Sequence, residues 1–165
     1  MKTKRTTYLL LTIIIFSMLI SSCKKQKSEN NQYVPVTEFD PNRDAAKDIQ
    51  NAIVEAKRTG KRILLDVGGD WCIWCHRLDN FFEDNKDINK FLHKNYVVVK
   101  INYSKENKNK AVLSQYPKIE GYPHLFVLDS DGTLLRSQNT GELESGDHHD
   151  REKVFTFLKT WAPYN

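Results

Sequence analysis

Residues 62–76 read RILLDVGGDWCIWCH, and this stretch decides how the rest of the chain is interpreted. Its first half, residues 62–67, is rich in branched apolar side chains, which is typical of a strand buried on both faces. Two glycines then break the strand, and apolar residues at helical spacing follow the second cysteine. The sequence therefore predicts a strand, a tight turn and a helix that opens on the pair Cys72 and Cys75.

The two cysteines stand at the start of the predicted helix, where backbone N–H groups have no partner within the helix. These groups favour a negative charge, so we expect Cys72 to react as a thiolate. Cys75 lies one helical turn further on and can close a disulfide with Cys72 after an attack. A purely structural disulfide is the alternative, but so small a ring constrains the unfolded chain little. We therefore expect Cys72 to be the nucleophile and Cys75 the resolving thiol.

The segment 71–75, WCIWC after an apolar strand, resembles the active site of the thioredoxin family. Asp66 lies six residues before the first cysteine, where thioredoxins carry a buried acid, and Lys100 stands where they carry a lysine near that acid. Tyr122-Pro123 precedes an apolar strand, as does the thioredoxin loop whose cis-proline faces the disulfide. The likeness covers roughly residues 44–162. It implies a thioredoxin fold, an α/β domain with a central mixed β-sheet flanked by helices on both faces.

The resemblance assigns a proton-transfer role to the buried acid. A carboxyl group in an apolar strand is costly to charge, so the pKa of Asp66 should rise toward neutrality, which suits proton exchange with Cys75. A solvated aspartate at a strand end is the alternative interpretation. Lys100 should approach Asp66, or else extend from the end of its strand into water.

Substrate contacts are expected around the cysteines. The resemblance implies a cis peptide bond before Pro123, which lets the backbone of Tyr122 pair with an extended substrate beside Cys72. Trp71 and Trp74 flank the thiols as apolar surface. Ile73-Trp74 replaces the Gly-Pro of ordinary thioredoxins. The sequence therefore does not determine where the redox potential lies within the family range of roughly −270 to −120 mV.

The N-terminus has the pattern of a targeting segment. Three basic residues precede an apolar run over 8–20, which is shorter than the roughly 20 residues that cross a bilayer. The run ends in Ser21-Ser22-Cys23, which resembles a bacterial lipoprotein signal cleaved before Cys23; a plain membrane anchor is the alternative. We expect a signal peptide over 1–22, a lipid on Cys23, a flexible tether over 23–32 and a thioredoxin-like domain over 33–165.

The cysteine count and the charge agree with this organisation. The chain has three cysteines, and lipidation of Cys23 would leave an even pair. Without the three basic residues of the signal, 22 basic residues remain against 21 acidic ones. This balance gives no indication of nucleic-acid binding.

The rest of the chain alternates strands and helices. The patterns predict an edge strand at 33–36, a helix from an N-cap at Asp40 to Gly60, helices at 87–92 and 111–116, a strand at 96–101, a strand–turn–strand unit over 125–137, a loop over 141–150 and a helix over 151–161.

Two other site types deserve comparison with the redox interpretation. Residues 72–76 also fit the c-type haem pattern Cys-x-x-Cys-His, and His93, His124, His148 or His149 could supply a distal ligand. However, both methionines lie in the predicted signal, and Asp66 and Pro123 would have no role in a cytochrome. His148-His149-Asp150 is interpreted as a polar loop rather than a metal site, and 129–132 as a hairpin turn rather than a calcium loop.

These observations predict an enzyme of the bacterial cell envelope, anchored by lipid and facing the periplasm or exterior. It would exchange thiols and disulfides with protein substrates, in the reducing direction, and depend on a membrane electron donor for its own re-reduction. We expect a monomer with no cofactor and no metal. The second hypothesis is a non-catalytic binding module that keeps the fold and docks a partner on its tryptophan-rich surface.

Overall fold

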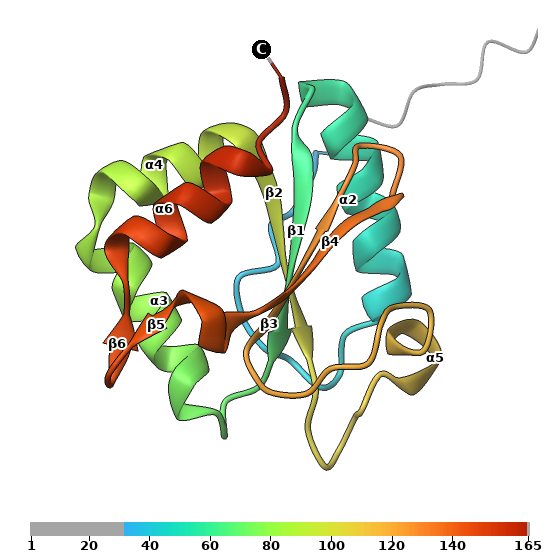
Figure 1. Cartoon of the computed structure of the whole chain (residues 1–165). Coiled ribbons are helices and arrows are strands. Elements are labelled where there is room, and N and C mark those ends of the chain that lie inside the picture. The colour runs from blue at the N-terminus through green and yellow to red at the C-terminus, as the bar shows by residue number, and fades with distance from the viewer. Residues whose placement is uncertain (1–31, 165) are drawn as a thin grey trace, which may run out of the picture. The chain divides into compact units, whose positions relative to one another are not determined.

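The computed structural model describes residues 32–164. The chain order is α2 (Ala45–Thr59), β1 (Arg62–Gly68), α3 (Ile73–Asp84), α4 (Lys86–Asn95), β2 (Tyr96–Asn102), α5 (Lys110–Leu113), β3 (His124–Leu128), β4 (Leu134–Asn139), the 3-10 helix η1 (Thr140–Leu143), β5 (Glu144–Ser145), β6 (His148–His149) and α6 (Arg151–Thr160). The larger sheet lies between two helical layers, with α3, α4 and α6 on one side and α2 and α5 on the other (Figure 1).

The larger sheet is mixed and has the strand order β2-β1-β3-β4. The first two strands in this order run parallel, and the other two neighbouring pairs are antiparallel. This is the predicted thioredoxin fold, with a mixed central sheet and helices on both faces. The register places Asp66 of β1 between Lys100 of β2 and Leu125 of β3.

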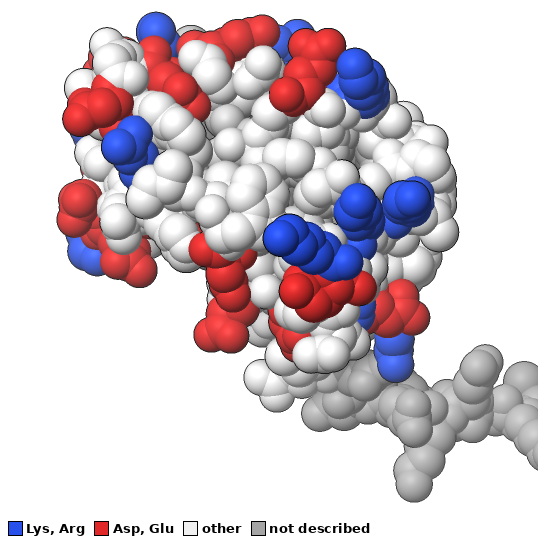
Figure 2. Space-filling model, turned by 90° about the horizontal axis from the view of Figure 1, so that it is seen from below, with Lys and Arg blue, Asp and Glu red and all other residues white. Residues whose placement is uncertain are grey.

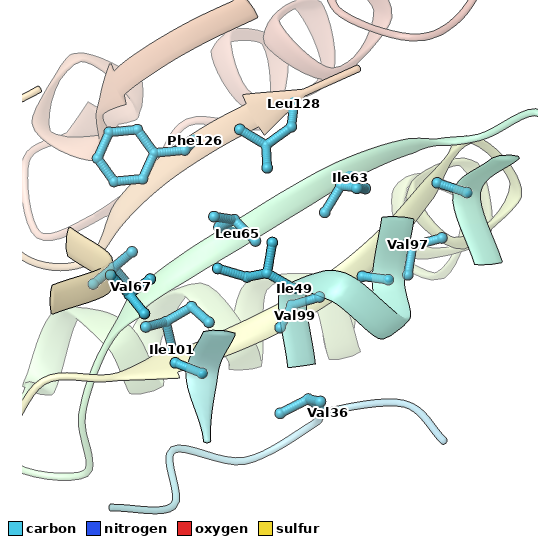
Figure 3. Packing of buried hydrophobic residues seen from close by; sticks show 14 residues of the cluster. Val36, Ile49, Ile63, Leu65, Val67, Val97, Val99, Ile101, Phe126 and Leu128 are labelled. Carbon is cyan, nitrogen blue, oxygen red and sulfur yellow. The ribbon is translucent and has the colours of Figure 1, made fainter. Parts of the chain in front are cut away.

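Alternation along β1 divides the interior into two apolar clusters, because successive side chains point to opposite faces. Ile63, Leu65 and Val67 pack toward α2, as Figure 3 shows. From β2, the side chains in the same cluster are Val97, Val99 and Ile101. Leu64 points to the other face, where it packs with residues of α3, α4 and α6. Asp66 has the same parity as Leu64, so its carboxyl group lies on the α3 side of the sheet.

The predicted start of the first helix at Asp40 is wrong. The N-cap of α2 is Asp44, whose carboxylate accepts a hydrogen bond from the Lys47 N–H at 3.1 Å. The Asp40 carboxylate instead accepts from the N–H of Asn42 at 2.8 Å. This contact closes a local turn before the helix, which explains why an aspartate followed by proline resembled a cap.

Three other expectations need correction. The helix predicted over 111–116 covers only Lys110–Leu113, because Pro117 disfavours helical backbone at Tyr116. The edge strand predicted at 33–36 is reduced to a single bridge between Val36 and Val99. The loop predicted over 141–150 includes all of η1 except Thr140 and the whole of the short β5-β6 pair.

The remaining predicted elements are confirmed with shifts of at most three residues at their ends, including the turn over 129–132. The predicted signal peptide, Cys23 and all of the tether except Gln32 lie outside the described residues. Within residues 32–164, no helix is both long enough and apolar enough to cross a membrane.

The corrected helix start predicts the effect of removing each aspartate. Asp44→Ala should lower the free energy of unfolding by about 1 kcal/mol, since the Lys47 N–H loses its acceptor. Asp40→Ala should have a smaller effect, because its carboxylate serves a turn outside the helix. Urea unfolding of both variants would measure this, and a larger loss for Asp40→Ala would place the cap where the sequence suggested it.

Candidate active site

The cysteine pair lies at the N-terminus of α3, as predicted. Cys72 is the N-cap residue, and its sulfur forms a disulfide with Cys75, with the two Cα atoms 5.3 Å apart. The Cys75 N–H points at the Cys72 sulfur, with a donor–acceptor distance of 3.2 Å. A backbone donor thus already points at the atom on which a thiolate charge would develop.

Gly68, at the end of β1, leaves the space that the resolving sulfur occupies. A Cβ at this position would overlap the Cys75 sulfur and would come within 3.1 Å of the Phe39 ring. The sequence indicated only that this glycine breaks the strand. The structure gives it a second role, because the close approach of β1 to Cys75 requires a residue without a side chain.

Asp66 is buried, with 5% of its surface exposed. Its Oδ1 has no hydrogen-bond partner among the described residues. Burial raises the pKa of Asp66 to about 7; nearby Lys100 opposes this shift and nearby Asp79 adds to it. The carboxyl group is therefore not the solvated strand-end aspartate of the alternative interpretation, and it can gain or lose a proton near neutral pH.

Lys100 lies near Asp66, but its main partner is a residue that the sequence analysis missed. Its Nζ is 2.5 Å from both carboxylate oxygens of Asp79 and 4.0 Å from Oδ2 of Asp66. Asp79 lies on α3, four residues after Cys75, so the two share one face of the helix. The spacing of four residues from Cys75 is the sequence feature that could have identified Asp79. As a result, the lysine is held beside Asp66 without forming a close ion pair with it.

A cleft of about 440 Å³ opens beside β2 and reaches this group of charges. Asp66, Asp79 and Lys100 line it together with apolar side chains such as Leu64 and Leu78. The acid is therefore buried below the sulfurs but lies at the wall of a cavity that could hold water.

The predicted substrate-side residues come together around an aromatic cluster. The Tyr122-Pro123 bond is cis, and the Tyr122 ring meets Trp71 edge-on, with centroids 5.6 Å apart. Tyr122 also stacks on Tyr103 at 4.8 Å, and the Trp71 Nε1–H donates to the Tyr103 carbonyl oxygen at 2.7 Å. Tyr122 packs against the buried cysteines. Tyr103, which connects the two predicted residues, was not identified from the sequence.

Trp74 is held between two side chains that the sequence analysis did not connect with it. The Arg77 guanidinium lies 4.4 Å from its ring centroid, and the His149 ring meets it edge-on at 5.6 Å. His149 is buried, so the prediction of a polar loop at this residue is wrong. Burial, Arg77 and His148 together lower the pKa of His149 to about 4.

Trp71 and Ile73 extend the apolar surface around the cysteines, with 57% and 62% of their surfaces exposed. Figure 2 shows the end of the molecule that carries the turn between β1 and α3. A broad uncharged area occupies the centre of this face, with acidic and basic residues around its edge. Within the described part of the chain, no three His, Cys, Asp or Glu side chains are grouped as metal ligands would be.

Comparisons with known proteins agree with this geometry. A family model described as thioredoxin-like matches residues 44–130. The disulfide bond reductase DsbH of Chlamydia pneumoniae is 27% identical over 93 residues, which are 51% of this chain and 55% of DsbH. The thiol:disulfide interchange protein DsbD of Pseudomonas sp. is 28% identical over 116 residues, which are 69% of this chain and 18% of DsbD. The chain therefore spans only part of the length of these relatives.

Solved structures resemble the fold over most of the described chain. A disulphide isomerase from Xylella fastidiosa Temecula1 has a TM-score of 0.64 at 28% identity, covering 74% of this chain and 94% of that one. The oxidised C-terminal domain of DsbD from Neisseria meningitidis has a TM-score of 0.58 at 19% identity. The match covers 76% of this chain and 99% of that domain. At that identity the second likeness concerns the fold alone.

The burial of Asp66 predicts a pH-dependent stability difference. Between pH 3.8 and about 7 the folded chain binds a proton at Asp66 that the unfolded chain has lost, so its stability falls as the pH rises through this window. Asp66→Asn should therefore raise the free energy of unfolding of the oxidised protein at pH 8, by on the order of 4 kcal/mol at most. The gain should vanish below pH 4. Denaturant unfolding at both pH values tests this, and an equal gain at both would contradict it.

The Asp79–Lys100 pair predicts a second effect on the same group. Asp79→Asn removes a negative charge and frees Lys100 to turn toward Asp66, and both changes lower the pKa of Asp66. A pH titration of the Asp66 carboxyl carbon by NMR would measure the shift. Asp84→Asn is the matched control, since it removes the same charge from an exposed site on the same helix. An equal shift in both variants would exclude a specific role for the pair.

Proposed function

We propose, from the premise that this chain belongs to the thioredoxin-like family, that it is a thiol-disulfide oxidoreductase that reduces disulfide bonds of other proteins. The observation that carries the proposal is the Cys72–Cys75 pair at the N-terminus of α3. Asp66 lies buried on the adjacent strand, two residues before the glycine that touches the Cys75 sulfur. A structural disulfide would require no buried acid beside it.

In the reduced protein, Cys72 is the nucleophile. Its thiolate attacks one sulfur of the substrate disulfide, the substrate S–S bond breaks, and a mixed disulfide with Cys72 forms. The released substrate sulfur leaves as a thiolate and takes a proton from water. The position of Cys72 at the N-cap of α3 supports this role, because the backbone N–H groups of the first turn stabilise the attacking charge.

Cys75 resolves the mixed disulfide. Its thiol passes a proton to the Asp66 carboxylate, and the resulting thiolate attacks the Cys72 sulfur. The bond between Cys72 and the substrate breaks, and the Cys72–Cys75 disulfide forms. The second substrate sulfur leaves as a thiolate and takes a proton from water, and Asp66 returns the Cys75 proton to water. The substrate has then gained two electrons and the enzyme has lost two. A pKa of about 7 makes Asp66 an effective base near neutral pH.

Lys100 contributes to this step through its charge. Held by Asp79 at 4.0 Å from Asp66, it limits how far burial raises the pKa of the carboxyl group. Without a nearby cation, the buried acid would stay protonated and could not accept a proton from Cys75.

The substrate would dock on the uncharged face around the cysteines (Figure 2). Trp71, Trp74 and Ile73 provide apolar contact area there, and the backbone of Tyr122 beside cis-Pro123 can pair with an extended peptide. The aromatic contacts of Trp71 and Tyr122 hold these two substrate-binding elements together.

We further propose that the enzyme acts as a monomer outside the cytoplasm, anchored by a lipid on Cys23. The apolar run before Cys23 and the otherwise unpaired third cysteine support this location. The reducing direction is supported by the name of the Chlamydia relative, a disulfide bond reductase. After each turnover the enzyme needs two electrons, which a dithiol donor at the membrane would supply.

Serine variants of the two cysteines test the reaction. The wild-type chain should reduce a protein disulfide such as that of insulin in the presence of a dithiol reductant. Cys75→Ser should accumulate a mixed disulfide that a reductant cleaves, whereas Cys72→Ser should lose turnover and trap nothing. If Cys72→Ser is as active as wild type, the chain is a docking module rather than an enzyme.

A further inference from the structure

A short arm before α2, residues 33–40, carries an aromatic side chain into the redox centre. The arm lies along β2, where Val36 forms a single bridge with Val99 and its carbonyl oxygen accepts from the Lys100 N–H at 3.2 Å. Near the end of the arm is Phe39, of which 5% is exposed. No pattern in the sequence suggested a functional role for this residue.

The Phe39 ring touches several parts of the site at once. It packs in one cluster with Cys72 and Cys75. Its ring lies close to Gly68, where an added Cβ would come within 3.1 Å of the ring. The Nζ of Lys100 lies 4.4 Å from its ring centroid. Apolar packing of the kind made with the cysteines is all that a core residue needs. The contact between the Lys100 ammonium and the aromatic ring is electrostatic as well.

The Lys100 ammonium is therefore enclosed by two different partners. The Asp79 carboxylate binds it through charge-assisted hydrogen bonds, and the Phe39 ring lies close to the same ammonium group. Asp66 is the remaining ionisable group beside the ammonium, at 4.0 Å. Lys61, Glu83 and His93 line the same cleft and, with the phenols of Tyr33 and Tyr96, complete the titratable groups that face it.

We propose that Phe39 is a positioning residue of the redox reaction, which holds the Lys100 ammonium against Asp79 and covers the Cys75 sulfur. The inference rests on the proposed function and extends it to a residue in the arm. Loss of the ring would free Lys100 to approach Asp66, and a closer cation favours the ionised carboxylate. The resolving step would then have a weaker base and a lower pH midpoint.

The test compares Phe39→Leu with a matched control elsewhere in the domain. Phe39→Leu keeps apolar volume but removes the ring face, and Phe39→Tyr keeps the ring. Phe155→Leu is the control, because the Nζ of Lys159 lies 4.5 Å from the Phe155 ring in the same kind of contact, on α6. Stopped-flow single turnovers across pH measure the resolving step, and thermal unfolding measures stability.

Phe39→Leu should lower the pH midpoint of the resolving step by about one unit and its plateau rate several-fold. Phe39→Tyr should keep the wild-type midpoint and plateau rate. Phe155→Leu should also leave both unchanged, even if it lowers the thermal stability as much as Phe39→Leu does. An unshifted midpoint in Phe39→Leu, or an equal shift in Phe155→Leu, would make Phe39 an ordinary core residue and overturn the inference.

An NMR titration of Asp66 in the oxidised Phe39→Leu protein gives a reading that does not depend on turnover. The pKa of Asp66 should fall relative to wild type, and an unchanged value would also overturn the inference. If wild type itself reduces no protein disulfide, the proposed function fails. If wild type turns over normally and Phe39→Leu keeps the wild-type midpoint, only the role of Phe39 fails.

Discussion

The burial of Asp66 in the central strand is the constraint on which the rest of the site depends. An aspartate without a hydrogen bond to one of its oxygens is costly in the middle of a sheet, and hydrophobic packing gives no reason to keep it there. The cost is partly offset by a cation held at an intermediate distance. If Lys100 paired closely with Asp66, the acid would stay ionised and be a poor base; if it were absent, the acid would stay protonated. Asp79 provides the intermediate case, because it binds the lysine more closely than Asp66 does.

The fold places these groups through simple registers rather than through special loops. Asp66 and Lys100 are partners in the parallel ladder between β1 and β2, so their side chains share one face of the sheet. Cys75 and Asp79 are one helical turn apart on α3, which packs on that same face. One strand pairing and one helix therefore determine the relative positions of the acid, its cation, the cation's partner and the resolving sulfur. Gly68 lets the strand and the sulfur approach each other closely.

Local patterns in the sequence predicted the strands, helices and turns. The site residues that these patterns missed are defined by long-range packing. The strand at 62–67, the helix that opens on Cys72 and the hairpin turn at 129–132 follow from short-range rules of burial and turn chemistry. The resemblance added the cis peptide bond at Pro123 and the neighbourhood of Asp66 and Lys100. Asp79 and Tyr103 were missed because charged or aromatic residues on a helix face or in a loop are common, and only their partners make them part of a site. Asp40 was mistaken for a helix cap because a turn uses the same aspartate chemistry.

Two contacts of the redox centre come from segments outside the region that the family model matches, residues 44–130. Phe39 reaches the cysteines from the arm that precedes this region, and His149 reaches Trp74 from the β5-β6 pair that follows it. The dipeptide Ile73-Trp74 differs from the Gly-Pro of ordinary thioredoxins, and Trp74 is fixed between Arg77 and His149. The relative stability of thiols and disulfide depends on what surrounds the two sulfurs. We therefore expect the redox potential of this chain to depend on the arm and on the β5-β6 pair as well as on the family motif.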